Sequence, residues 1–200
     1  MPANHNSLIL VNPFMAVKFK HSDSYSTYFC SFTCYRWIAL FEITNSYDTV
    51  YKWFEYLKSK SGDVVSYVIM PNHVHCILYF RNIPFDLNKV IGNGKRFMAY
   101  EIIKRLEALN KTEVLSQLCH ITDREIKKGQ KHKVFEESFD AKPIFSEPFL
   151  EQKVNYIHMN PVRGKWNLAE DFTQYQHSSA SFYETGEAFH FKPVHYKDVN

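Results

Sequence analysis

The chain has 200 residues, of which 45% are hydrophobic, and a formal net charge of +3. This length is enough for one domain with a buried core, with or without short extensions. The sequence contains no membrane-length apolar run, no CxxC pair and no signal pattern, which predicts a cytoplasmic protein without a membrane partner or zinc knuckle.

Charge and aromatic residues are distributed in a way that suits a nucleic-acid partner. Residues 89–133 carry eleven Lys and Arg against five Asp and Glu, whereas the rest of the chain has a net negative charge. Aromatic residues make up 16% of the chain, and exposed ones can stack on unpaired bases. A phosphate-facing surface fits these counts, as do a solvated helix face and ordinary aromatic core packing.

The sequence predicts one folded domain between a short extension and a short tail. Residues 1–24 show no clean periodicity and are interpreted as an N-terminal extension. We expect the domain to span residues 25–185 and residues 186–200 to form a peripheral tail. Within the domain, the aromatic run at 28–37 predicts the first strand. Apolar residues at helical spacing predict a helix over residues 47–60.

Two β-prone runs, residues 64–70 and 73–80, predict an antiparallel hairpin, and the Pro-Asn pair between them is typical of a turn. Because side chains alternate along a strand, His73 and His75 are expected on one face, with the apolar residues on the other face in the core. Two imidazoles on one strand face can hold a divalent ion, although two half-buried structural histidines are the plainer alternative.

Residues 86–110 are expected to be mostly helical, with an interruption at Gly92–Gly94. Two glycines so close together cost about 2 kcal/mol of helix stability. Lys95 and Arg96 would then lie at the start of the second helical part, where backbone N–H groups point outward. Such a helix start can bind phosphate, so these two residues are candidate phosphate contacts.

The stretch after this helix has a less regular pattern. Residues 113–128 are interpreted as a further helix or an insertion, and the basic run at 127–133 as a flexible linker. Residues 134–136 are expected to begin an edge strand. Residues 141–144 are expected to be extended, since the residue before a proline avoids the helical region. The fourth predicted strand therefore lies near residues 134–145.

A further helix is predicted to begin after Ser146, a residue type that caps helices. Its buried stripe has the spacing i, i+4, i+7. That stripe is Leu150, Val154 and Ile157. Tyr156 borders this buried face, and Asn160, four residues later, lies on the same side of the helix as Tyr156.

Two blocks of the sequence carry a resemblance. The block MPNHVHCILYF begins at Met70, and the block QKVNYIHMNPVRGKW begins at Gln152. Together they resemble the single-tyrosine HUH transposases, and in particular the REP-associated tyrosine transposases. Residues 175–180, YQHSSA, are similar to a further segment of that family. The resemblance covers roughly residues 28–183 and is strongest in these three places.

The resemblance implies an α+β fold, with an antiparallel sheet of four or five strands and helices packed on one face, as in the ferredoxin-like HUH transposase fold. It implies a metal-dependent transposase or endonuclease that nicks and rejoins single-stranded DNA at hairpin-flanked sites. The intermediate would be a covalent 5′-phosphotyrosine. The partner would be a hairpin-bearing single strand, and the protein would act as a monomer or homodimer.

The family's site residues carry over onto matching positions of this chain. Tyr156 would be the nucleophile, and Asn160 would complete, with His73 and His75, a site for Mg²⁺ or Mn²⁺. Imidazole and amide oxygen donors without thiolates suit these ions better than structural Zn²⁺. The DNA-binding residues would be Lys95, Arg96, Lys153 and Arg163.

Two other functions are open at this point. One is a domesticated DNA-hairpin-binding protein that no longer cuts, against which the intact histidines and tyrosine argue. The other is an unrelated metallohydrolase that uses water as the nucleophile. It would need Asp or Glu ligands, and neither of the two long blocks supplies them near the histidines.

Overall fold

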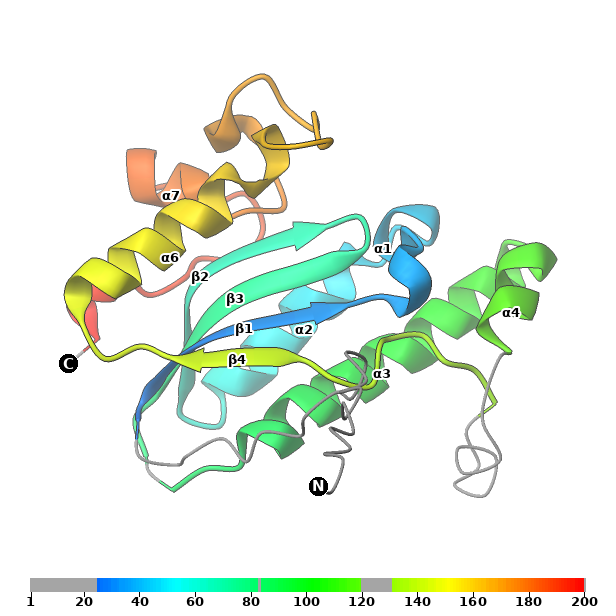
Figure 1. Ribbon diagram of the computed structural model, residues 1–200, viewed down its shortest axis with the longest axis horizontal. Helices are drawn as coiled ribbons and strands as arrows, with labels where there is room; N and C mark the ends of the chain where they lie inside the picture. The colour runs from blue at the N-terminus through cyan, green and yellow to red at the C-terminus, as the bar shows by residue number, and fades with distance from the viewer. Residues whose placement is uncertain (1–24, 83, 120–130, 200) are drawn as a thin grey trace, which may run out of the picture.

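The computed structural model describes residues 25–82, 84–119 and 131–199. Within these residues four strands form one antiparallel sheet in the order β2-β3-β1-β4, with helices on both sides of it (Figure 1). The strands are β1 (Thr27–Thr33), β2 (Gly62–Met70), β3 (His73–Phe80) and β4 (Asp140–Pro143). The predicted α+β class and antiparallel sheet are confirmed.

Three long helices frame the sheet: α2 (Tyr47–Lys58), α3 (Leu87–Ala108) and α6 (Glu147–Met159). The short helices are α1 (Leu40–Ile43), α4 (Thr112–Leu118) and α7 (Ala180–Thr185). The 3₁₀ turns are η1 (Tyr35–Trp37), η2 (Asn160–Val162), η3 (Phe172–Gln174) and η4 (Tyr196–Asp198). No helix of the described chain has the length and apolar character needed to cross a membrane.

β2 and β3 form the hairpin that the sequence predicts, with Pro71–Asn72 at its turn. β2 begins slightly earlier than predicted, at Gly62. β1 ends earlier than predicted, at Thr33. Beyond it the backbone becomes left-handed, with φ of 52° at Arg36 and 59° at Trp37, a conformation that a strand does not accommodate.

One face of the sheet packs against α2 and α3. Val74, Cys76 and Leu78 of β3 are buried there with Trp53 and Phe54 of α2. This arrangement confirms the predicted alternation along β3, in which the residues between and after the two histidines belong to the core.

α6 covers the opposite face of the sheet (Figure 1). Its Leu150, Val154 and Ile157 pack on Phe29 and Ile77, as their helical spacing predicts. The expectation that the helices pack on one face is therefore wrong. Every residue of β2 is buried, and a hydrophobic cluster lies on each side of the sheet, so both faces are covered.

The C-terminal residues cover the outer edge of β2. The N–H of Ser179 donates to the carbonyl of Tyr67 at 2.9 Å, and the N–H of Val194 donates to that of Val64 at 2.9 Å. Phe191 is buried in the α2–α3 layer. The expectation of a peripheral tail from residue 186 is wrong, because β2 is an edge strand whose polar backbone groups need partners.

The stretch before α6 differs in detail from its prediction. β4 pairs with β1 and agrees with the extended segment predicted at 141–144. Residues 134–136 form no strand, and Phe135 makes an isolated bridge to Cys34. α4 accounts for the first part of the element predicted over 113–128. The rest of that element, much of the basic linker and the N-terminal extension lie outside the described residues.

α3 runs without a break through Gly94, so the predicted interruption is wrong. A Cβ at Gly94 would lie 2.6 Å from Nε1 of Trp53. The glycine lets α3 approach the indole closely, and this packing outweighs the low helix propensity of glycine. Lys95 and Arg96 consequently lie inside a helix. The phosphate-binding helix start predicted for them does not exist.

Gly94→Ala and Gly92→Ala are expected to change stability in opposite directions. At Gly94 the added methyl meets the indole, so the free energy of unfolding should fall by about 1–3 kcal/mol. Nothing lies within 4 Å of a Cβ at Gly92, so alanine there should raise it by about 0.5–1 kcal/mol. Urea denaturation measures both changes. Equal effects at the two positions would contradict the close contact with Trp53.

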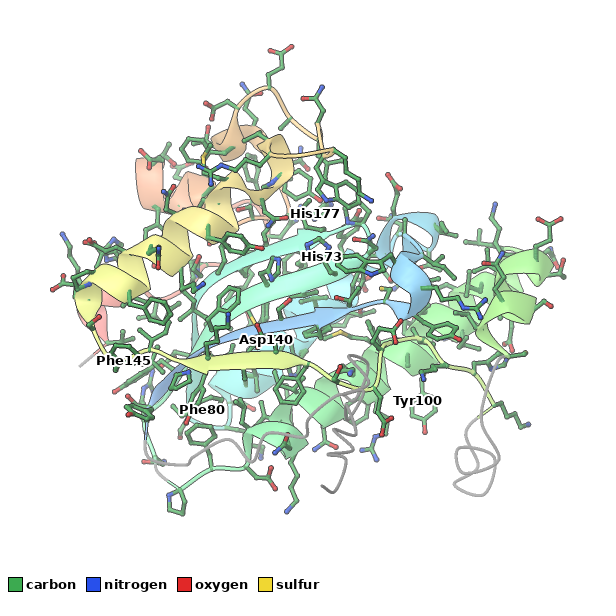
Figure 2. All side chains as sticks on the ribbon, viewed as in Figure 1. His73, Phe80, Tyr100, Asp140, Phe145 and His177 are labelled. Carbon is green, nitrogen blue, oxygen red and sulfur yellow. The ribbon has the colours of Figure 1, made fainter. Side chains whose placement is uncertain are left out.

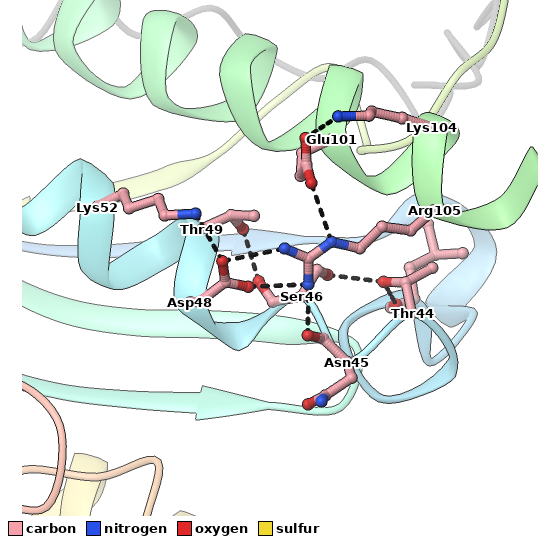
Figure 3. A network of polar contacts seen from close by, with 10 residues as sticks. Thr44, Asn45, Ser46, Asp48, Thr49, Lys52, Glu101, Lys104 and Arg105 are labelled. Carbon is pink, nitrogen blue, oxygen red and sulfur yellow. Dashed lines mark hydrogen bonds and ion pairs between the residues drawn. The ribbon is translucent and has the colours of Figure 1, made fainter. Parts of the chain in front are cut away.

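Arg105 joins α3 to the start of α2 through a polar network (Figure 3). Its guanidinium is paired with Asp48 at 2.9 Å and with Glu101 at 3.1 Å. It also donates to the carbonyl of Asn45 at 2.5 Å. These contacts fix the two helices relative to each other.

Candidate active site

A cleft of about 300 Å³ lies between the β2–β3 hairpin and the end of α6. Its lining residues are Ser31, Thr33, Trp37, His73, His75, Tyr156, Asn160, Arg163, Gly164 and Trp166. Each predicted metal ligand and the predicted nucleophile are in this set. The fold therefore brings together two motifs that are widely separated in the sequence.

His73 and His75 lie on the same face of β3, with ring centroids 4.7 Å apart. β1 pairs with β3 in a register that sets Thr33 opposite His73 and Ser31 opposite His75. Residues opposite each other in a sheet share a face, so these two small side chains lie beside the imidazoles. They leave room for a ligand in the cleft.

Asn72 fixes the orientation of His73. Its Nδ2 donates to the carbonyl of Trp37 at 2.9 Å, so its Oδ1 accepts from Nδ1–H of His73 at 2.7 Å. Nε2 of His73 therefore carries the lone pair when the ring is neutral. Burial lowers the pKa of His73 to about 4, against an opposing hydrogen bond with Asn160. The ring is neutral at pH 7.

His75 is buried beside Phe29, whose ring stacks on it at a centroid distance of 5.6 Å. Burial lowers the pKa of His75 to about 3, with contributions from the charges of His73 and Lys153. Nδ1 of His75 has no hydrogen-bond partner in the part of the chain that the structure describes. Both histidines are thus neutral at pH 7, the form in which imidazole binds metal ions.

α6 positions Tyr156 over the histidines. The hydroxyl of Tyr156 lies 3.5 Å from Nε2 of His75, and the side chain is 43% exposed, so a large substrate can reach the hydroxyl. Asn160 follows one turn later at the end of α6 and hydrogen bonds to His73. The spacing of four brings both residues to one cleft, as the sequence predicts.

Lys153 and Arg163 lie beside the same cleft. Nζ of Lys153 is 4.9 Å from the ring centroid of Phe29 and 5.6 Å from that of Tyr156. Arg163 is exposed just after η2 and lines the cleft. Lys153 thus lies against the ring of Tyr156, and Arg163 shares its cleft.

Lys95 and Arg96 lie elsewhere. They line a second cleft, of about 630 Å³, between α3 and residues 131–137. Tyr100, which lines this second cleft, projects from α3 far from His73 (Figure 2). Nζ of Lys95 donates to the carbonyl of Glu136 at 2.6 Å, and burial lowers its pKa to about 8. The ammonium of Lys95 is therefore bound to a carbonyl of the same chain. DNA contact by Lys95 or Arg96 stays a prediction.

The remaining histidines near α6 serve the fold. His158 is buried, and its Nε2 lies 2.9 Å from Oγ of Ser179 and 3.2 Å from Oγ of Ser66. It is not among the residues that line the cleft. His177 stacks on Tyr47 at a centroid distance of 3.7 Å. The YQHSSA segment thus secures the edge of β2.

The donors of the cleft fit Mg²⁺ or Mn²⁺. Two neutral imidazoles and the amide oxygen of Asn160 leave positions for phosphate and water. Nδ1 of His75 has no hydrogen-bond partner among the described residues, so the ring is not fully satisfied by protein contacts. This is consistent with a ring that binds a ligand. No Asp or Glu lines this cleft, and the described residues hold no cluster of three His, Cys, Asp or Glu suited to a metal. The described residues that line the cleft therefore supply no carboxylate ligand of the kind that a metallohydrolase needs.

Three residues of this region were not identified from the sequence: Asn72, Trp37 and Trp166. Asn72 reads as a turn residue, and its place directly before His73 is the one signal that could have revealed its second role. Trp37 and Trp166 reach the cleft through turns that follow β1 and α6. The periodicity of a strand or helix does not predict where the turn after it places a side chain.

Comparison with known proteins bears on the fold. No protein-family model and no curated protein matches the chain. A solved structure of a REP-associated tyrosine transposase bound to a REP hairpin matches with a TM-score of 0.55 and 16% sequence identity. The match covers 88% of this chain and 92% of that chain. The chain has the fold of this tyrosine transposase.

A second solved structure is that of a candidate transposase from Deinococcus radiodurans. It matches with a TM-score of 0.38 and 12% identity, over 78% of this chain and 95% of that chain, and a likeness of this size supports no inference. What the chain shares with the REP-associated transposase at 16% identity is the fold. The chemistry has to be argued from the residues of its own cleft.

Proposed function

We propose that the protein is a metal-dependent transposase or endonuclease that nicks and rejoins single-stranded DNA at hairpin-flanked sites, with Tyr156 as the nucleophile. The observation that carries this proposal is the position of the Tyr156 hydroxyl. It lies 3.5 Å from Nε2 of His75, in a cleft that also holds His73 and Asn160. The transposase fold supports the reaction class, and the hairpin bound to the transposase of similar fold supports the choice of DNA.

The proposed reaction is a transesterification. The phenolic oxygen of Tyr156 attacks phosphorus and loses its proton, while the bond from phosphorus to the 3′ oxygen breaks and that oxygen gains a proton. The protein keeps the 5′ phosphate as a phosphotyrosine. Attack by a 3′ hydroxyl of another strand reverses the step, so that cutting and joining need no outside energy source.

The residues of the cleft have separate tasks in this reaction. Lys153 and Arg163 would bind the phosphate and balance its charge, for which the planar guanidinium of arginine is well suited. His73, His75 and Asn160 would hold Mg²⁺ or Mn²⁺, which acts on the phosphate as a Lewis acid. Asn72 would keep His73 in the tautomer whose Nε2 can bind a metal ion.

A cleavage assay tests this function. The protein is mixed with Mg²⁺ or Mn²⁺ and a hairpin-bearing single strand from the flanks of its own gene, or with the same sequence as a duplex. We expect a covalent protein–DNA product on a denaturing gel with the single strand, and none with the duplex or with EDTA. A shifted native complex without a covalent product would favour the hairpin-binding alternative instead.

A further inference from the structure

Trp37 stands at the mouth of the cleft with its indole largely in solvent. It is 60% exposed, whereas Trp53 is buried and Trp166 is half-buried. Its ring centroid lies 5.8 Å from that of His73, and it lines the cleft that holds Tyr156. A large aromatic surface is thus presented to whatever approaches the first histidine.

The backbone that carries this indole is strained and is held in place by hydrogen bonds. Arg36 and Trp37 have φ of 52° and 59°, two successive left-handed residues that are not glycine. Such a conformation persists where the surroundings determine it, and it is frequent at functional sites. The Trp37 N–H donates to the carbonyl of Cys34 at 3.1 Å, and the Arg36 N–H donates to Oε1 of Glu136 at 2.9 Å.

One side chain couples the backbone of Trp37 to the site. Nδ2 of Asn72 donates to the carbonyl of Trp37, and Oδ1 of the same amide accepts from His73. The backbone of Trp37 and the orientation of His73 are therefore fixed by the same amide, and the indole lies at the edge of the His73 ring. If a molecule stacks on the indole of Trp37, the group bonded to its stacked part would lie beside His73.

The charge around the indole identifies the kind of occupant. Arg163 lines the cleft, and Nζ of Lys165 lies 5.4 Å from the ring centroid of Trp166, which in turn is 6.2 Å from that of His73. Among the residues that the structure describes, no carboxylate lines the cleft. A flat apolar surface beside cations matches an unpaired nucleotide, which has a stacking face and a phosphate, whereas the bases of a duplex have no free face.

We propose that Trp37 stacks on the unpaired base next to the phosphate that meets Tyr156, and so makes the cleft select single-stranded over duplex DNA. This inference rests on the proposed function and adds to it the residue that recognises an unpaired base. Stacking on an indole is tolerant of base identity, so the preference is for an unpaired base of any sequence.

The test uses the Tyr156→Phe protein, which under the proposed function should bind DNA without cutting it. The probe is a hairpin with unpaired tails in which 2-aminopurine, whose fluorescence falls on stacking, replaces one tail base at a time. We expect quenching at one position near the hairpin foot, lost on adding Trp37→Ala. Affinity should fall by about tenfold with Trp37→Ala and much less with Trp37→Phe. Tyr56→Ala, at an exposed aromatic of α2, is the matched control and should change neither signal.

The outcomes separate this inference from the function on which it rests. If Trp37→Ala binds and quenches like its parent, the inference is overturned, while a covalent product from the protein with Tyr156 intact still supports the function. A lower molar mass of Trp37→Ala by light scattering, with unchanged DNA affinity, would make Trp37 a contact between copies and also overturn it. Neither DNA binding nor a covalent product from the unaltered protein would overturn both.

Discussion

Tyr156→Phe is expected to abolish the covalent product and to lower strand cleavage by more than about 1,000-fold, because phenylalanine has no oxygen to attack phosphorus. The hydroxyl's contact with His75 is long, at 3.5 Å, and the side chain is 43% exposed. The free energy of unfolding should therefore change by less than about 0.5 kcal/mol. Single-turnover cleavage of end-labelled hairpin DNA and thermal unfolding measure the two effects.

Tyr56→Phe is the matched control for this substitution. Tyr56 is exposed on α2 and is not among the residues that line the cleft, so its loss of a hydroxyl should leave cleavage unchanged. If the Tyr156→Phe protein cuts DNA at the rate of the unaltered protein, water rather than the tyrosine is the nucleophile, and the tyrosine mechanism is wrong.

His75→Ala is expected to weaken Mn²⁺ binding by more than about 100-fold and to abolish cleavage. Loss of groups that merely orient a ligand costs 10–100-fold in metal affinity, and loss of a ligand should cost at least as much. Burial lowers the pKa of His75 to about 3, so at pH 7 the substitution removes a neutral donor and not a charge. Calorimetric titration of the protein with Mn²⁺ alone measures this effect without reference to cleavage.

Two further variants make the metal result interpretable. His190→Ala removes an exposed histidine outside the cleft and should bind Mn²⁺ as the unaltered protein does. His75→Ala leaves a cavity that could impair folding. His73→Gln tests the other ligand with a polar side chain of similar size, so its result does not depend on that cavity. Unchanged Mn²⁺ affinity in both folded ligand variants would refute the metal site.

The two motifs of the cleft could be predicted because short-range periodicity determines each of them. Alternation along β3 places His73 and His75 on one face, and a spacing of four places Tyr156 and Asn160 on one side of α6. Their meeting depends on the buried stripe of α6 packing against the sheet. The helical periodicity predicts the buried stripe. It does not predict which face of the sheet the stripe covers, because that depends on contacts between segments distant in the sequence.

The features that could not be predicted all depend on such distant contacts. The break expected at Gly94 does not occur because Trp53, on another helix, occupies the space that a side chain would fill. The tail from residue 186 packs against the domain because β2 lies at the edge of the sheet. That position is set by the order of the strands, which local sequence patterns do not reveal. The position of Trp37 depends on left-handed backbone held by Asn72, which no pattern in the strand before it reveals.

The most direct measurement is the mass of the tryptic peptide that carries the DNA. Cleavage after Lys153 and Arg163 releases residues 154–163, in which Tyr156 is the single tyrosine. After the covalent product is treated with nuclease, we expect this peptide to carry a nucleotide joined through its 5′ phosphate. A nucleotide on a peptide with another tyrosine, or no modified peptide from a protein that cuts DNA, would contradict the assignment of Tyr156.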